Sequence, residues 1–194
     1  FPGLSAKPLR QPPVHRFSFN APPAPAPDGT TVPDLIGGLS ATIRGANAAF
    51  TGQAVQLPGG SSTTEAYLDF PNGLISSWEN VTIEFWETQS GPQVWSRILS
   101  IGTNKVGEIH GPGGDFTGSE TLTLFGNVGA MQINRFARSY GTLANGGPDR
   151  DPASYPDSEY GVEFHQVITY DKRLEEWHWY RNGLLMEVIP DREG

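Results

Sequence analysis

Residues 164–188 read FHQVITYDKRLEEWHWYRNGLLMEV and predict a β-hairpin. The dipeptide Asn182-Gly183 favours a two-residue type I′ turn, because both positions accept positive φ at little cost. Side chains alternate along the strand EWHWYR (residues 176–181), so its two tryptophans share one face while the histidine and the tyrosine share the other. Aromatic side chains on both faces are typical of a sheet that is covered on both sides.

The rest of the sequence predicts a loop-rich all-β fold. The chain of 194 residues contains 24 Gly and 17 Pro, and no stretch has the sustained apolar spacing of a long helix. Many short strands separated by turn residues indicate an antiparallel two-sheet β-sandwich or jelly roll. Besides the hairpin, we expect strands around residues 14–20, 54–57, 66–70, 81–88, 94–101, 121–125, 130–136 and 161–170.

Two segments stand apart from this strand pattern. Residues 1–13, FPGLSAKPLRQPP, form a proline-rich arm, and residues 14–194 are expected to form one domain. Residues 139–160 are predicted to form a long polar loop, which is either functional or simply solvated.

Charge and composition exclude several classes of function. The net charge of −8 argues against a nucleic-acid partner, since phosphates require a basic patch. No apolar run approaches the roughly 20 residues that span a bilayer, so membrane insertion is not expected. The chain has no cysteine for a disulfide or a thiolate, and it begins at Phe1, which favours a processed, exported protein.

Several segments, taken together, resemble a known family. They are HRFSFN (15–20), PDLIGG (33–38), AYLDFPNGLISS (66–77), VTIEFWE (81–87), WSRILSIG (95–102) and HQVITYD…WHWYRNGLL (165–185). This combination resembles the laminin-G-like (LamG) jelly roll of the concanavalin A-like lectin and glucanase superfamily, in the form found in secreted bacterial proteins. The resemblance implies an extracellular domain at the bacterial cell surface that binds sugars or proteins, or acts as a spacer.

One departure from that family suggests self-assembly. LamG domains normally continue beyond this hairpin to a further strand that returns beside the N-terminal strand, and no residues supply it here. An open sheet edge near residues 14–20 would recruit another strand. We therefore expect a structural subunit that forms a homopolymeric extracellular filament, unless the arm folds back on its own domain. The expected contacts are Phe1, Leu4 and Leu9 of a neighbour's arm, and Val14, Phe17 and Phe19 at the edge.

Catalysis is not expected. Glucanases of this superfamily place their carboxylates on one face of a strand, whereas Glu84 and Glu87 are three residues apart and project from opposite faces. The four histidines show no metal-ligand spacing, and His165 and His178 are expected to be packed and hydrogen-bonded.

The alternative function is a carbohydrate-binding or adhesion module of a larger cell-surface protein. Exposed aromatic rings stack on sugars, and the candidates at or near loops are Trp78, Trp95, Tyr140 and Tyr155. By contrast, Trp86, Trp177 and Trp179 are expected in the core.

No cofactor is expected, and calcium is the one ion for which the sequence offers candidate ligands. Its candidate ligands are Asn20, Asp28 and Asp34, which flank the first loops. Against this, carboxylates in turns commonly cap their own backbone.

Overall fold

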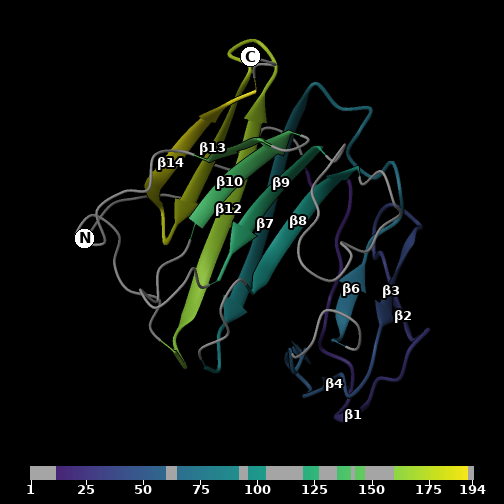
Figure 1. Ribbon diagram of the computed structural model, residues 1–194. Coiled ribbons are helices and arrows are strands. Elements are labelled where there is room, and N and C mark those ends of the chain that lie inside the picture. The colour runs from purple at the N-terminus through teal and green to yellow at the C-terminus, as the bar shows by residue number, and fades with distance from the viewer. Residues whose placement is uncertain are drawn as a thin grey trace, which may run out of the picture. The chain divides into compact units, whose positions relative to one another are not determined.

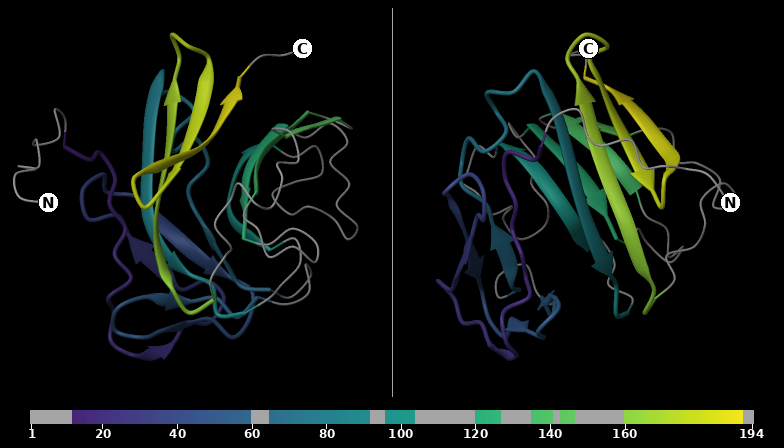
Figure 2. Two further views of the ribbon diagram at one scale, coloured as in Figure 1. Left: turned by 90° about the vertical axis from the view of Figure 1, so that its left-hand side faces the viewer. Right: turned by 180° about the vertical axis from the view of Figure 1, so that it is seen from behind.

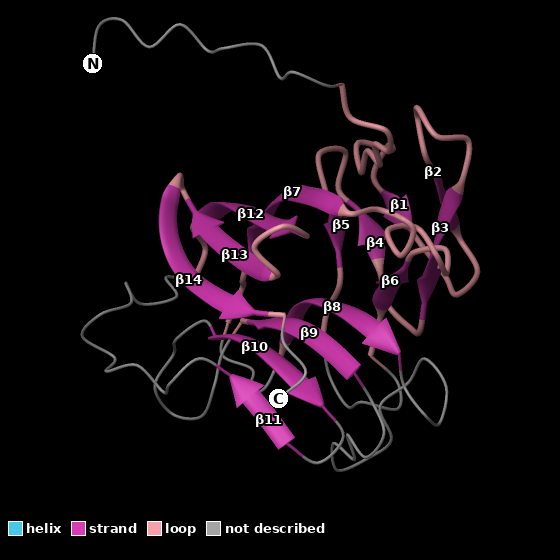
Figure 3. Cartoon of the chain, turned by 90° about the horizontal axis from the view of Figure 1, so that it is seen from above, coloured by secondary structure: helices cyan, strands magenta, loops and turns pink. Residues whose placement is uncertain are grey.

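The computed structural model describes residues 12–59, 65–91, 96–103, 120–126, 135–140, 143–146 and 160–191 (Figure 1). All regular structure in these residues is antiparallel β, which confirms the all-β prediction (Figure 3). Among them there is no helix with the length and apolar character that crossing a membrane requires. The chain divides into two compact units, Phe1–Leu74 and Ile75–Gly194, and this boundary falls within the single domain expected over residues 14–194.

Within its described residues, the first unit contains two small sheets. One has the order β1-β4-β5, with β1 at Ala24–Pro25, β4 at Ala49–Phe50 and β5 at Val55–Gln56. The other has the order β2-β3-β6, with β2 at Thr31–Pro33, β3 at Ser40–Arg44 and β6 at Tyr67–Asp69.

Small side chains form the core of this unit. The buried hydrophobic residues are Ala26, Val32, Ala41, Ile43, Ala48 and Ala66, and several phenylalanines pack around them. In β3, Ala41 and Ile43 point inward while the residues between and beside them are more exposed, as a half-buried strand requires.

The prediction of a strand over residues 14–20 is wrong. Only an isolated bridge joins Phe17 to Asp34 in this segment. The backbone N–H of Arg16 donates to the Asp34 carboxylate (2.9 Å), and the carbonyl of Arg16 accepts from the N–H of Leu35 (2.8 Å). Because Asp34 and Leu35 take the N–H and the carbonyl of Arg16, these backbone groups are not available for a ladder with a neighbouring strand.

The second unit contains two four-stranded sheets. Sheet A has the order β14-β13-β12-β7, and sheet B has the order β11-β10-β9-β8 (Figures 1 and 2). The strands of sheet A are β7 (Asn80–Thr88), β12 (Glu163–Asp171), β13 (Glu176–Arg181) and β14 (Leu184–Pro190). Those of sheet B are β8 (Arg97–Thr103), β9 (Glu120–Phe125), β10 (Arg135–Tyr140) and β11 (Leu143–Gly146).

The predicted C-terminal hairpin is confirmed. β13 pairs with β14, and the two turn residues have positive φ angles of 49° (Asn182) and 78° (Gly183). This is the backbone geometry that an Asn-Gly turn supplies at little cost.

Side chains from both sheets form one hydrophobic cluster in the second unit. Leu122 and Leu124 come from sheet B, and Ile168, Trp179 and Ile189 come from sheet A. Trp179 is fully buried and Trp177 packs against the cluster, which confirms the core prediction for both.

The loop predicted over residues 139–160 is wrong at its start. There β11 pairs with the end of β10, with Tyr140 opposite Leu143 and Ser139 opposite Ala144. The sequence LANG has little intrinsic strand propensity, so pairing with β10 determines its conformation. Residues 147–159 lie outside the described part of the chain.

Candidate functional site

The aromatic residues predicted to bind sugar are only partly described. Trp78 precedes β7 and is 46% exposed, and its backbone N–H donates to the carbonyl of Ile75. Tyr140 is the last residue of β10, and the structure describes only its backbone. Trp95 and Tyr155 lie outside the described residues.

Of the residues predicted to take part in assembly, Val14, Phe17 and Phe19 are described, and none of them lies in a strand. Phe17 and Phe19 pack against the core of the first unit, where Phe17 meets Phe70 edge to face with ring centroids 4.9 Å apart. Val14 is about half exposed. Phe1, Leu4 and Leu9 lie outside the described residues.

Among the calcium candidates, Asp34 uses both carboxylate oxygens to hold a turn. Oδ1 accepts from the backbone N–H groups of Arg16 (2.9 Å) and Ile36 (3.0 Å), and Oδ2 lies 2.6 Å from Nδ1 of His15. Burial acts to raise the pKa of Asp34, but hydrogen bonds from the Arg16 N–H, His15 and the N–H groups of Gly37 and Ile36 outweigh it and lower that pKa. The carboxylate is therefore a structural acceptor in the fold.

The other two calcium candidates also accept local hydrogen bonds. Oδ1 of Asp28 accepts from the N–H of Gly45 (3.0 Å), and Oδ1 of Asn20 accepts from the hydroxyl of Ser18 (2.9 Å). Within the described ranges, no group of three or more histidine, aspartate or glutamate side chains could hold a metal ion.

The feature that the sequence prediction missed is Trp86, which is 60% exposed on the outer face of sheet A. Burial alternates along β7, so Ile83 and Phe85 face the hydrophobic cluster while Glu84 and Trp86 face outward. The core prediction for Trp86 is wrong, because a residue next to the inward Phe85 must point the other way. The alternation in VTIEFWE already indicates that Trp86 faces outward, but two adjacent aromatic residues both have the composition of a core.

One contact holds the exposed indole in place, and a second contact fixes the imidazole that makes it. The imidazole of His165, on β12, stacks on Trp86 with centroids 4.7 Å apart and planes inclined by 20°. Nε2 of His165 lies 2.7 Å from Oε1 of Glu84. The backbone of His165 is fixed as well, since its N–H donates to Oδ1 of Asn182 (3.0 Å) and its carbonyl accepts from the N–H of Asn182 (2.8 Å).

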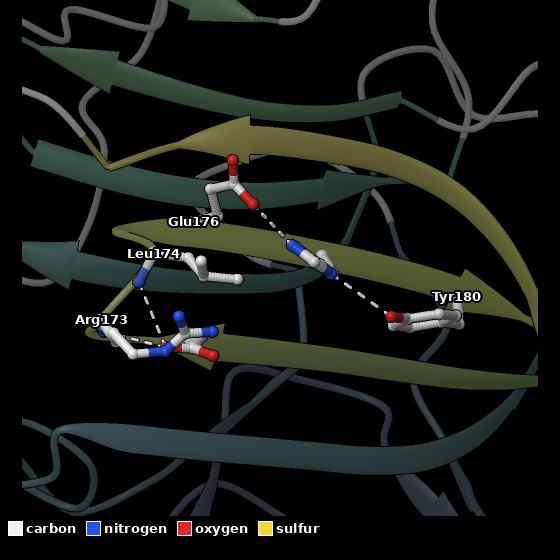
Figure 4. Close-up of polar contacts among 6 residues, drawn as sticks. Arg173, Leu174, Glu176 and Tyr180 are labelled. Atoms are coloured by element: carbon white, nitrogen blue, oxygen red, sulfur yellow. Dashed lines mark hydrogen bonds and ion pairs between the residues drawn. The ribbon is translucent and has the colours of Figure 1, made fainter.

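A second histidine is held on β13, on the same face of sheet A. Nε2 of His178 lies 3.0 Å from Oε2 of Glu176, and Nδ1 lies 3.3 Å from the hydroxyl of Tyr180 (Figure 4). Both histidines are therefore hydrogen-bonded, as the sequence predicts.

The turn between β12 and β13 is capped by a carboxylate. Oδ1 of Asp171 accepts from the N–H groups of Arg173 (2.8 Å) and Leu174 (3.2 Å). Figure 4 labels these two donor residues and draws both hydrogen bonds. This turn lies at one end of sheet A, because Asp171 pairs with Asn80 at the start of β7.

Glu84 and Glu87 lie on opposite faces of β7, as predicted. Glu87 faces inward, where its Oε1 accepts from Nε2 of Gln166 (3.0 Å), and Oε1 of Gln166 accepts from the indole N–H of Trp179 (2.8 Å). Burial raises the pKa of Glu87. The two glutamates cannot act together on one glycosidic bond.

In comparisons with known proteins, the chain matches no family model, no curated protein and no solved structure.

Proposed function

We propose that the chain is a non-catalytic, secreted carbohydrate-binding domain of the bacterial cell surface, in which the outer face of sheet A contacts the sugar at Trp86. In this proposal the second unit is a LamG-like jelly roll whose two sheets face each other. The observation that carries the proposal is an exposed indole held against His165.

The geometry around Trp86 suits a pyranose ring. The C–H groups of a sugar carry partial positive charge and meet the negative face of an aromatic ring favourably. The adjacent His165 and Glu84 offer hydrogen-bonding groups beside that surface. His165 and Glu84 already restrain each other in the free protein. Binding of a sugar would therefore cost little further side-chain entropy, which favours affinity.

Two observations support the remaining parts of the proposal. The hydrophobic cluster that both sheets contribute to is the arrangement a jelly roll requires. The opposite orientation of Glu84 and Glu87 supports a binding role over hydrolysis.

The test compares two exposed tryptophans of the same unit. Native-gel retardation by a panel of soluble polysaccharides would be measured for the wild type, Trp86→Ala and Trp78→Ala. We expect Trp86→Ala to weaken retention by roughly tenfold or more, as loss of a stacking platform does, while Trp78→Ala binds like the wild type. Equal retention of wild type and Trp86→Ala would place the sugar elsewhere, and no retention by any polysaccharide would contradict the function itself.

Self-assembly is a second candidate, favoured by the edges of sheet A. Within the described residues, β7 pairs only with β12 and β14 pairs only with β13. Leu184 and Leu185, at the start of β14, are 67% and 53% exposed. A strand from another copy could extend either edge, and the donor we propose is still the arm over residues 1–13.

Sedimentation velocity tests this second candidate. The full chain should form polymers at micromolar concentration, and a variant lacking residues 1–13 should remain monomeric. A full chain that sediments as a monomer would contradict self-assembly without affecting the sugar proposal.

A further inference from the structure

The register of sheet A places Trp86 between two carboxylates. Trp86 pairs with His165, Thr88 pairs with Glu163, and Glu84 pairs with Val167. Residues two apart along a strand share a face, so Glu84 lies beside Trp86 on β7 and Glu163 lies diagonally across from it on β12. Both glutamates are exposed, Glu84 by 47% of its side chain.

No lysine or arginine lies on the outward-facing positions of the described strands of sheet A. Arg181, the last residue of β13, is buried on the inner side, where its guanidinium lies 4.7 Å from the centroid of the Phe164 ring. Lys172 and Arg173 belong to the turn at the other end, where the N–H of Lys172 donates to the carbonyl of Glu79.

The distance to that turn is large compared with the range of surface electrostatics. Six residues of strand separate Asn80 from Trp86, which corresponds to about 20 Å. Charges in water are largely screened beyond about 8 Å at physiological salt. Among the charged side chains on the outward-facing positions of the described strands of sheet A, Glu84 and Glu163 therefore lie beside the indole.

We propose that the Trp86 site selects glycans with free, protonated amino groups, that is, polymers containing glucosamine rather than its N-acetylated form. This inference rests on the proposed function and names its ligand class. An ammonium group near an indole face is attracted by the ring quadrupole, and an exposed carboxylate can accept its hydrogen bond. Uronates and sulfated sugars would meet like charge from both glutamates.

The roles of the residues differ. The indole makes the binding surface for any pyranose, so Trp86 contributes to the affinity for every sugar, whatever its charge. The two carboxylates determine which sugar is preferred, because their contribution depends on the charge of the ligand. Glu84 can accept a hydrogen bond from the ligand's ammonium group while it still holds His165. Its Oε1 contacts the imidazole, and the side chain remains half exposed.

Calorimetric titration of the full chain with three short oligosaccharides tests the inference. The probes are a glucosamine oligomer, the same oligomer fully N-acetylated and an oligogalacturonate, at a pH at which the amines are protonated. We expect the glucosamine oligomer to bind about tenfold more tightly than the acetylated one, and the uronate not to bind. Added salt should weaken only the glucosamine complex.

Three charge-removing variants give the matched comparison. Glu84→Gln and Glu163→Gln should each lower the preference for the glucosamine oligomer severalfold, measured as the ratio of its affinity to that of the acetylated oligomer in the same variant. Glu79→Gln removes the same charge from an exposed position near the start of β7 and should behave like the wild type. Thermal melts of each variant establish that it is folded.

The outcomes separate this inference from the proposed function. If all three oligosaccharides bind equally and Trp86→Ala abolishes binding, the proposed function stands and the amine preference is wrong. If none of the three binds, the amine preference is wrong, and the polysaccharide panel with Trp86→Ala decides separately whether the proposed function stands. If polylysine binds at Trp86 as tightly as the glucosamine oligomer, the site recognises cations in general and the glycan assignment is overturned.

Discussion

The imidazole of His165 lies against the indole of Trp86, with ring centroids 4.7 Å apart and planes inclined by 20°. The pair joins β7 to β12 across the outer face of sheet A, and Glu84 fixes the imidazole through a 2.7 Å contact at Nε2. An exposed tryptophan would otherwise sample several rotamers, so this contact restricts the surface that a ligand meets.

We predict that His165→Ala weakens saccharide affinity without abolishing it. The stack orders the indole before a ligand binds, and an aromatic pair contributes about 0.5–1.5 kcal/mol beyond area burial, so loss of this ordering should lower affinity by at most roughly two- to tenfold. Titration calorimetry with the best polysaccharide of the panel measures the change.

His178→Ala is the control for His165→Ala. His178 lies on the same face but is held by Glu176 and Tyr180 on its own strand, and it pairs with Thr169 of β12, whereas Trp86 pairs with His165. It should leave the affinity as in the wild type. If both histidine variants lose affinity equally, the binding surface extends across sheet A and is not centred on Trp86.

A second prediction concerns Gly37 in the first unit. A Cβ at this position would collide with Nδ1 of His15 and Oδ2 of Asp34, the two atoms that close the turn. We expect Gly37→Ala to destabilise the protein by about 1–3 kcal/mol, the usual cost of overpacking. Differential scanning calorimetry measures it.

The control for Gly37→Ala is Gly91→Ala, because a Cβ at Gly91 meets no atom within 4 Å. That variant should unfold at the temperature of the wild type. Equal unfolding temperatures for the two variants would show that the turn around Asp34 accommodates the added methyl group. The close packing at Gly37 would then contribute nothing to stability.

A third prediction follows from the lowered pKa of Asp34. A carboxyl whose pKa is lower in the folded state stabilises the fold fully above its ordinary pKa of about 3.9, and loses this contribution as the pH falls towards the folded value. Asp34→Asn should therefore be less stable than the wild type at pH 7, and the difference should shrink below about pH 4. Thermal melts followed by circular dichroism across this range measure it, and a difference that is constant with pH would contradict the role of the ionised carboxylate.

The sequence was sufficient to predict the parts of the fold that local patterns determine. The turn at Asn182-Gly183 has its own backbone signature, and the alternation over Asn80–Thr88 fixes which side chains share a face. The same alternation assigned Glu84 and Glu87 to opposite faces.

Other features depend on partners that are distant in the sequence. Residues 14–20 alternate like a strand, but the carboxylate of Asp34 takes the backbone groups that a strand would offer. The strand Leu143–Gly146 has little propensity of its own and exists because β10 pairs with it. Trp86 is predicted in the core because aromatic residues usually fill it, although its position next to Phe85 already requires the outer face.

The fourth prediction concerns the buried chain of hydrogen bonds from Glu87 through Gln166 to Trp179. Burial raises the pKa of Glu87, so the folded state binds a proton that the unfolded state releases near its ordinary pKa of about 4.3. Between the ordinary pKa of glutamate and the raised pKa of Glu87, the folded state binds more protons than the unfolded state. The free energy of unfolding therefore falls as the pH rises through this window. Glu87→Gln cannot ionise and keeps an oxygen that accepts from Gln166, so it should not show this loss.

Urea unfolding measures the difference between wild type and Glu87→Gln from pH 4 to pH 8. All five tryptophans lie in the Ile75–Gly194 unit, so their fluorescence follows the unit that contains Glu87. We expect the variant to gain stability relative to the wild type as the pH rises, reaching a difference of order 1 kcal/mol at neutral pH. Glu79→Gln removes the same charge from an exposed position and reports the effect of net charge alone. If Glu87→Gln and Glu79→Gln give parallel pH profiles, the buried carboxyl does not stay protonated beyond its ordinary range, and the inward face of β7 tolerates a charge next to Gln166.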